Sequence, residues 1–191
     1  MEEPKTDRRV RKTKKQLRMA LTTLMMERGA GDITVREIAE LADVNRGTFY
    51  AHYRDVNDLL TQLEQNVFDR LEEISVSNRS RSGGDALEAY LTDVMTLCRD
   101  SADIYRALVI RNNDMAFQQK LLEELKNHYL RSFISRSSTA SAREQELFCS
   151  FAVQGMLSLT NSWMESGLRE TPEEIAGFGS RFILRGLEAL N

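Results

Sequence analysis

Apolar residues recur every three or four positions along most of the chain, the spacing of one face of an amphipathic α-helix. The first such stripe consists of Leu17, Ala20, Leu21, Leu24 and Met25. Similar stripes follow to the C-terminus, and polar segments such as 75–84 separate them. The 191 residues include only two prolines and ten glycines, and such a low content of helix breakers favours long helices. The pattern predicts an all-α protein of about nine helices.

Capping residues indicate where several helices begin. Thr34 and Glu37 have the spacing of a capping box, and Asn45 is a good N-cap for a second short helix. Two helices this short bury little surface alone, so they need the helix over 17–26 to complete a small core. This is the plan of a helix-turn-helix, in which the second helix of the pair enters the major groove of DNA.

The second short helix carries side chains suited to DNA. Arg46 can donate two hydrogen bonds to guanine, and Thr48 can offer a hydroxyl and a methyl group to base edges. Gly47 lets the backbone approach closely, and the other polar groups can reach phosphate oxygens. A helix N-terminus such as that at Thr34 also attracts phosphate. The predicted DNA contacts here are Thr34, Arg36, Asn45, Arg46, Gly47, Thr48, Tyr50, His52 and Arg54.

Charge is distributed unevenly. Residues 8–54 contain eleven Lys or Arg and five Asp or Glu, although the whole chain has a net charge of −3. A basic N-terminal part on an acidic body is typical of a protein that binds a polyanion at one end. Two alternatives stay open for the basic segment Arg8–Lys15. Either Arg8, Arg9 and Arg11 contact DNA, or the segment is a solvated tail.

The run IAELADVNRGTFYAHY at 38–53, followed by DLL at 58–60, resembles the signature of the tetracycline-repressor-like (TetR/AcrR) family. The resemblance covers about residues 11–63. It implies a three-helix DNA-binding domain (8–55), a helical effector-sensing and dimerisation domain (56–191), and a homodimer on a palindromic operator in double-stranded DNA. Two residues depart from the family pattern: Asp43 replaces a glycine in the turn, and Val56 replaces a lysine that contacts phosphate.

The runs FAVQG at 151–155, WMESG at 163–167 and TPEE at 171–174 resemble one C-terminal subgroup of the same family. In that subgroup the last two helices pair with those of a second subunit. The dimer contacts that this implies are Ala152, Gly155, Leu159, Phe178, Phe182 and Gly186. The alternative is that these residues pack within one chain.

An effector pocket is expected among the middle helices, and the effector is left open between a small molecule and a partner protein. The candidate lining residues are Phe68, Leu91, Met95, Tyr105, Phe117, Leu121, Tyr129, Gln154 and Trp163. The alternative is that they form ordinary core, which is the commoner role of apolar stripes at helical spacing.

Enzymatic chemistry has no support in the sequence. The chain has two histidines, His52 and His128, and neither a metal motif nor a glycine-rich phosphate loop. We therefore expect no catalysis, no metal and no cofactor, and we expect Cys98 and Cys149 to be small apolar core residues. The charged N-terminus is unlike a signal peptide and no apolar run approaches a membrane span, so we expect a cytoplasmic protein.

The predicted function is sequence-specific regulation of transcription, as a repressor controlled by an effector. Two alternatives are kept. One is a helical protein-interaction module without DNA binding, and the other is a transcriptional activator controlled by a partner protein.

Overall fold

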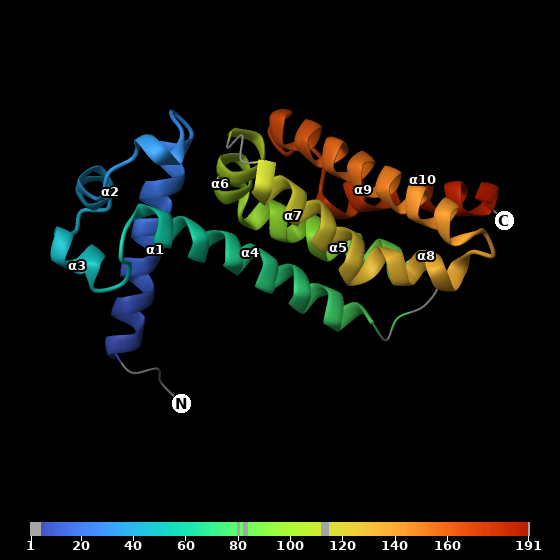
Figure 1. Cartoon of the computed structure of the whole chain (residues 1–191), viewed down its shortest axis with the longest axis horizontal. Coiled ribbons are helices and arrows are strands. Elements are labelled where there is room, and N and C mark those ends of the chain that lie inside the picture. The colour runs from blue at the N-terminus through green and yellow to red at the C-terminus, as the bar shows by residue number, and fades with distance from the viewer. Residues whose placement is uncertain (1–4, 80, 82–83, 112–114, 191) are drawn as a thin grey trace. The chain divides into compact units, whose positions relative to one another are not determined.

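The computed structural model describes residues 5–79, 81, 84–111 and 115–190 (Figure 1). These residues form helices and connections and contain no strand, so the all-α prediction is confirmed. The helices are α1 (Lys5–Met25), η1 (Ala30–Asp32), α2 (Val35–Leu41), α3 (Arg46–Tyr50), α4 (Val56–Asn78), α5 (Gly84–Asp100), α6 (Ala102–Tyr105), η2 (Arg106–Arg111), α7 (Met115–Leu125), η3 (Lys126–Leu130), α8 (Arg131–Ser137), α9 (Ala142–Glu165) and α10 (Pro172–Leu190).

The described helices outnumber the nine expected mainly because of π-helical segments. The periodicity predicts one helix over 115–134, whereas the structure has α7 and α8 joined by the π-helical η3. A π-helical turn contains more residues than an α-helical one and therefore rotates the face that follows it. A second π-helical segment, η2, follows α6 where one short helix was expected.

The chain divides into two compact units. The first comprises the described parts of Met1–Asn66 and Asp103–Asp114, and the second those of Val67–Ala102 and Met115–Asn191. The division lies inside α4. The functional boundary expected near residue 55 stays a prediction, because compactness does not say which part binds DNA.

The first unit is built on a core that α1, α2, α3 and α4 share. The fully buried side chains of these helices are Leu17, Leu21, Ile38, Phe49, Leu59 and Leu63, and Leu108 of η2 in the same unit is also fully buried. Burial of each such side chain stabilises the fold by about 1.5–3 kcal/mol, so this small core is enough to hold two very short helices in place.

The turn between α2 and α3 is a Schellman motif. The Val44 N–H donates to the Ala39 carbonyl at 3.0 Å and the Asp43 N–H donates to the Glu40 carbonyl at 3.3 Å. Asp43 has a φ of 53°, the left-handed conformation in which glycine has no steric cost. Asp43 thus adopts the glycine-like conformation that its position in the family pattern implies.

The start of α2 is the capping box that the sequence predicts. The Thr34 N–H donates to Glu37 Oε2 at 2.9 Å, and the Glu37 N–H donates to Thr34 Oγ1 at 3.4 Å. The hydrogen bond from the Thr34 hydroxyl, then the Arg28 guanidinium, lower the pKa of the Glu37 carboxyl to about 2. Ser141 and Glu144 form a second capping box at the start of α9.

The second unit packs α10 against α5 and α9. Two glycines of α10 admit side chains of α9. Met156 occupies the space where a Cβ on Gly179 would lie, and Phe148 Cε2 lies 2.6 Å from the equivalent point on Gly186. Trp163 is buried at the end of α9, and its Nε1–H donates to the Glu170 carbonyl at 2.9 Å.

Asp43→Ala should lower the free energy of unfolding by about 1 kcal/mol, because alanine is strained in a left-handed conformation. Asp43→Gly should cause no loss, because glycine adopts that conformation freely. Urea denaturation followed by circular dichroism measures both changes. Asp100→Ala, within α5, is the control. Equal losses for the alanine and glycine variants would show that the aspartate side chain matters and the backbone does not.

The low pKa of Glu37 predicts a pH effect on stability. Because this pKa lies below the ordinary value of 4.5, ionised Glu37 stabilises the fold above about pH 4.5, and the contribution is lost as the pH falls toward 2. Glu37→Gln keeps a capping side chain but cannot titrate. Its free energy of unfolding should therefore fall less steeply than that of the parent protein between about pH 5 and 3. Glu188→Gln, on exposed α10 surface, is the control, and an identical slope for Glu37→Gln and the parent would disprove the assignment.

Candidate nucleic-acid interface

Helix α3 presents a polar surface on top of one buried ring. Asn45 caps the helix, since its Oδ1 accepts from the Thr48 N–H at 3.0 Å. Phe49 is fully buried and lies 5.7 Å from the Tyr53 ring, centroid to centroid. The buried ring fixes the rotation of α3. Arg46 and Tyr50 are left exposed, and Thr48 is half-buried.

Gly47 has a role in this geometry that the sequence does not indicate. A Cβ at position 47 would lie 2.9 Å from the capping Oδ1 of Asn45. A side chain there would require the capping oxygen to shift, and complete loss of an N-cap costs about 0.5–2 kcal/mol. The glycine therefore leaves the N-cap of α3 undisturbed, and it adds no side chain to the exposed face of the helix.

The three arginines of this region differ in their partners. Arg46 has no hydrogen-bond or ion-pair partner among the described residues. Arg36 donates to Glu40 at 2.7 Å, and this hydrogen bond raises the pKa of the Arg36 guanidinium. The Arg54 backbone N–H donates to Asp58 at 2.8 Å, while its guanidinium lies 3.5 Å from the same carboxylate. Arg46 is the one of the three whose guanidinium has no contact with a carboxylate among the described residues.

The remaining predicted contacts lie on or beside the same helices. Tyr50 is 58% exposed and His52 is half-buried. Thr34 is exposed at the start of α2, but its hydroxyl and backbone N–H already bind the Glu37 carboxylate. A phosphate at Thr34 would compete with that carboxylate.

The basic segment is helical. Residues 8–15 lie within α1, where Arg8, Arg9 and Arg11 are exposed. The Lys14 ammonium lies 5.9 Å from the centroid of the Tyr53 ring, within the range of a cation–π contact. That contact joins the basic part of α1 to the residue that follows the α3 turn.

The candidate effector residues are mostly core in the second unit. Phe68 and Phe117 place their ring centroids 5.6 Å apart, and the Thr160 hydroxyl donates to Met95 Sδ at 3.5 Å. Gln154 is exposed. Tyr105 belongs to the first unit and is half-buried, and the side chain of Tyr129 lies outside the described residues. The other buried candidates are Leu91, Leu121 and Trp163.

The candidate dimer residues fall into two groups. Ala152 is buried and Gly186 is covered by Phe148 of the same chain, while Leu159 is half-buried. Phe178 and Phe182, in contrast, are 45% and 66% exposed, with ring centroids 4.9 Å apart. Gly155 is also exposed.

Two further exposed apolar side chains on α9 were not predicted, Phe151 at 75% and Leu147 at 53%. Their i, i+4 spacing puts them on one face of the helix. This spacing is visible in the sequence but does not say whether the face is buried within the chain.

Other kinds of site find no support in the described residues. No group of three His, Cys, Asp or Glu side chains there could hold a metal ion. None of the helices described combines the length and apolar character needed to cross a membrane. Cys149 is buried, as expected of a core residue, whereas Cys98 is half-buried. Desolvation raises the pKa of the Cys98 thiol to about 12 and also raises that of Cys149.

Solved structures with the same fold are transcriptional regulators. The dihydroxyacetone kinase operon activator DhaS is 18% identical, covers 94% of this chain and 98% of its own, and has a TM-score of 0.62. FadR from Bacillus subtilis, solved in complex with stearoyl-CoA, is 16% identical, with coverage of 88% and 96% and a TM-score of 0.66. NalD, the secondary repressor of the MexAB-OprM multidrug efflux pump in Pseudomonas aeruginosa, is 18% identical, with coverage of 93% and 96% and a TM-score of 0.69.

Two family models match the sequence itself. The model for the tetR family of bacterial regulatory proteins matches residues 19–63, which include the helix-turn-helix. The model for the C-terminal region of transcriptional regulators matches residues 85–185, more than half of the chain. The first match lies within the first unit, and the second covers most of the second unit together with Asp103–Asp114 of the first. The chain belongs to the tetR family of transcriptional regulators.

Proposed function

We propose that this protein is a homodimeric, sequence-specific DNA-binding regulator whose α3 enters the major groove of a palindromic operator. The observation that carries the proposal is the polar face of α3. Arg46 is exposed there above the buried Phe49 ring and has no partner in the part of the chain that the structure describes. A guanidinium held this way can donate two hydrogen bonds to guanine O6 and N7. Thr48 is the second base contact.

Phosphate contacts position this helix. Tyr50, His52 and Arg54 follow the base-contacting residues, and Thr34 and Arg36 lie at the start of α2. Arg36 would exchange Glu40 for phosphate at little cost, because exposed ion pairs contribute only about 0–1 kcal/mol. The exposed Arg8, Arg9 and Arg11 extend the same positive surface along α1 and add salt-dependent affinity.

The dimer is proposed to form through α9 and α10. Phe151, Phe178 and Phe182 are large, exposed and apolar, and such side chains at the centre of an interface contribute much of its binding energy. Gly155 leaves open space on the same helix as Phe151, so a second α9 can approach closely there. A two-fold dimer matches the two half-sites of a palindrome.

The second unit is proposed to bind the effector. The related FadR binds stearoyl-CoA, which favours a small molecule over a partner protein. An effector acts by changing the spacing of the two α3 helices, which must match successive major grooves about 34–36 Å apart. We infer a non-catalytic protein that acts in the cytoplasm, where its DNA is.

We propose that the protein represses transcription, because the structurally similar NalD is named as a repressor. Activation is the specific alternative, because DhaS is named as an activator. Mapping the selected operator relative to a promoter distinguishes them, since an operator that overlaps the polymerase site indicates repression. A protein-interaction module without DNA binding is the remaining alternative.

Selection from random duplex DNA tests the proposal, and it should enrich a palindrome. Arg46→Ala should then weaken binding to that palindrome by about 1–3 kcal/mol, while binding to non-specific DNA changes little. Fluorescence anisotropy on both duplexes measures this, and Arg136→Ala on exposed α8 is the matched control. No enrichment would refute the function. An equal loss on both duplexes would reassign Arg46 to a phosphate contact.

Phe182→Glu should convert the dimer to a monomer, because a carboxylate would be buried in an apolar interface. Operator affinity should fall by about 100-fold or more, because each half-site would then bind independently. Sedimentation velocity and anisotropy measure the two effects. The control is Met115→Glu, which changes an apolar side chain that is 72% exposed on α7. A Phe182→Glu protein that remains dimeric would place the interface elsewhere.

A further inference from the structure

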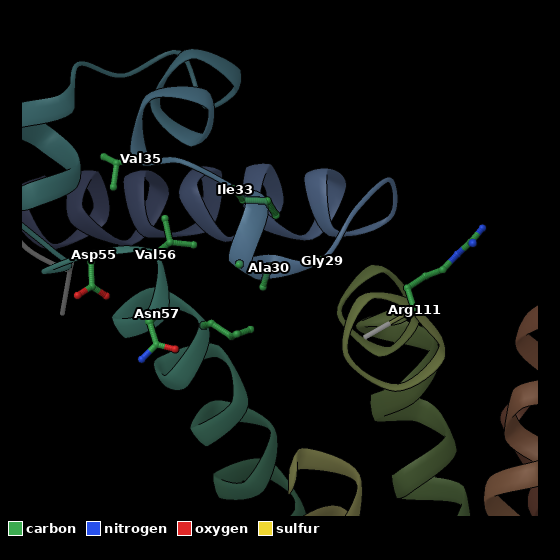
Figure 2. A pocket seen from close by; sticks show the side chains of 10 residues that line it. Gly29, Ala30, Ile33, Val35, Asp55, Val56, Asn57 and Arg111 are labelled. Atoms are coloured by element: carbon green, nitrogen blue, oxygen red, sulfur yellow. The ribbon is translucent and has the colours of Figure 1, made fainter. Parts of the chain in front are cut away.

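An open groove of about 800 Å³ lies within the first unit (Figure 2). Its walls come from η1 and the residues around it, from the first turn of α4, and from Arg111 at the end of η2. The functions proposed above give the groove no role. Its volume is within the range of about 300–1,000 Å³ typical of small-molecule sites.

The middle of the groove is apolar. Ile33, Val56 and Leu60 line it, and all three are buried or half-buried. Gly31 lines it without a side chain, and a Cβ built there meets nothing within 4 Å. The groove thus offers aliphatic walls and unfilled space, which favour the flat or elongated apolar body of a ligand.

The two ends of the groove carry opposite charges, and only one of the two charged side chains already has a hydrogen-bond partner among the described residues. Figure 2 shows Asp55 and Arg111 at opposite ends, with Val56 and Asn57 between them, and the Arg111 side chain extends away from these residues. The Asp55 carboxylate already caps α4, since it accepts from the Asp58 N–H at 2.8 Å. The Arg111 guanidinium is exposed and has no partner among the described residues. An anionic group of a ligand would therefore bind at the Arg111 end of the groove, away from the Asp55 carboxylate.

We infer that this groove binds a small amphipathic anion. Its apolar body lies against Ile33, Val56 and Leu60. Its carboxylate or sulfonate accepts hydrogen bonds from Arg111, whose exposed side chain turns toward the groove to bind such a group through two N–H donors. A ligand here touches the segment that leads into α2 and the first turn of α4 at once. It would occupy a site separate from the effector site proposed in the second unit.

The probe for the test is 1-anilinonaphthalene-8-sulfonate, an aromatic sulfonate, added to the full-length protein. Nuclear Overhauser effects between its ring protons and labelled methyl groups report where it binds. The expected result is contact with the methyl groups of Ile33, Val56 and Leu60. Contacts confined to methyl groups of the second unit, such as those of Leu91 and Leu121, would overturn the inference while leaving the regulator function intact.

Two variants test separately the contribution of the Arg111 charge and that of the open space beside Gly31. Arg111→Gln should weaken probe binding at these methyl groups by about tenfold, the loss expected for one charge-assisted hydrogen bond. Arg136→Gln, a charge-matched change in the second unit, should leave it unchanged. Gly31→Phe should fill the groove and abolish the contacts, with helicity by circular dichroism retained. Unchanged binding in Arg111→Gln, or in a folded Gly31→Phe protein, would refute the site.

Discussion

The proposed DNA-binding surface depends on the burial of one phenylalanine. Helix α3 has five residues, too few for its own hydrogen bonds to hold it in water. It persists because Phe49 is fully buried beside Tyr53 and because Asn45 caps its first turn. The same burial that stabilises the helix sets its rotation, so packing beneath α3 decides which side chains face outward.

Capping residues in the sequence correctly predicted where several helices begin. The capping boxes at Thr34 and Ser141 and the N-cap at Asn45 are formed as their spacing indicates, because each needs only side chains three residues apart. The left-handed Asp43 follows from comparison with the family pattern. These features are short-range, and a sequence specifies short-range geometry directly.

Features that depend on distant packing were not predictable. The π-helical segments η2 and η3 have no compositional signal. Gly186 illustrates the limit, since a small residue on α10 could receive either Phe148 of its own chain or a helix of a second subunit. Apolar periodicity likewise gave Phe68, Met95 and Trp163 as candidates for both core and pocket. Apolar periodicity predicts that a helix face is buried, but it does not say whether another helix, a ligand or a second subunit buries it.

The contact between Gly47 and the Asn45 cap limits how this protein can diverge. Any larger residue at position 47 would disturb the capping oxygen 2.9 Å away. Mutation there therefore lowers the stability of α3 whether or not DNA is bound. Positions 46 and 48 are free of that constraint. In a lineage that keeps this cap, a change of preferred operator would therefore arise by exchanging the neighbours of the glycine and leaving the glycine itself in place.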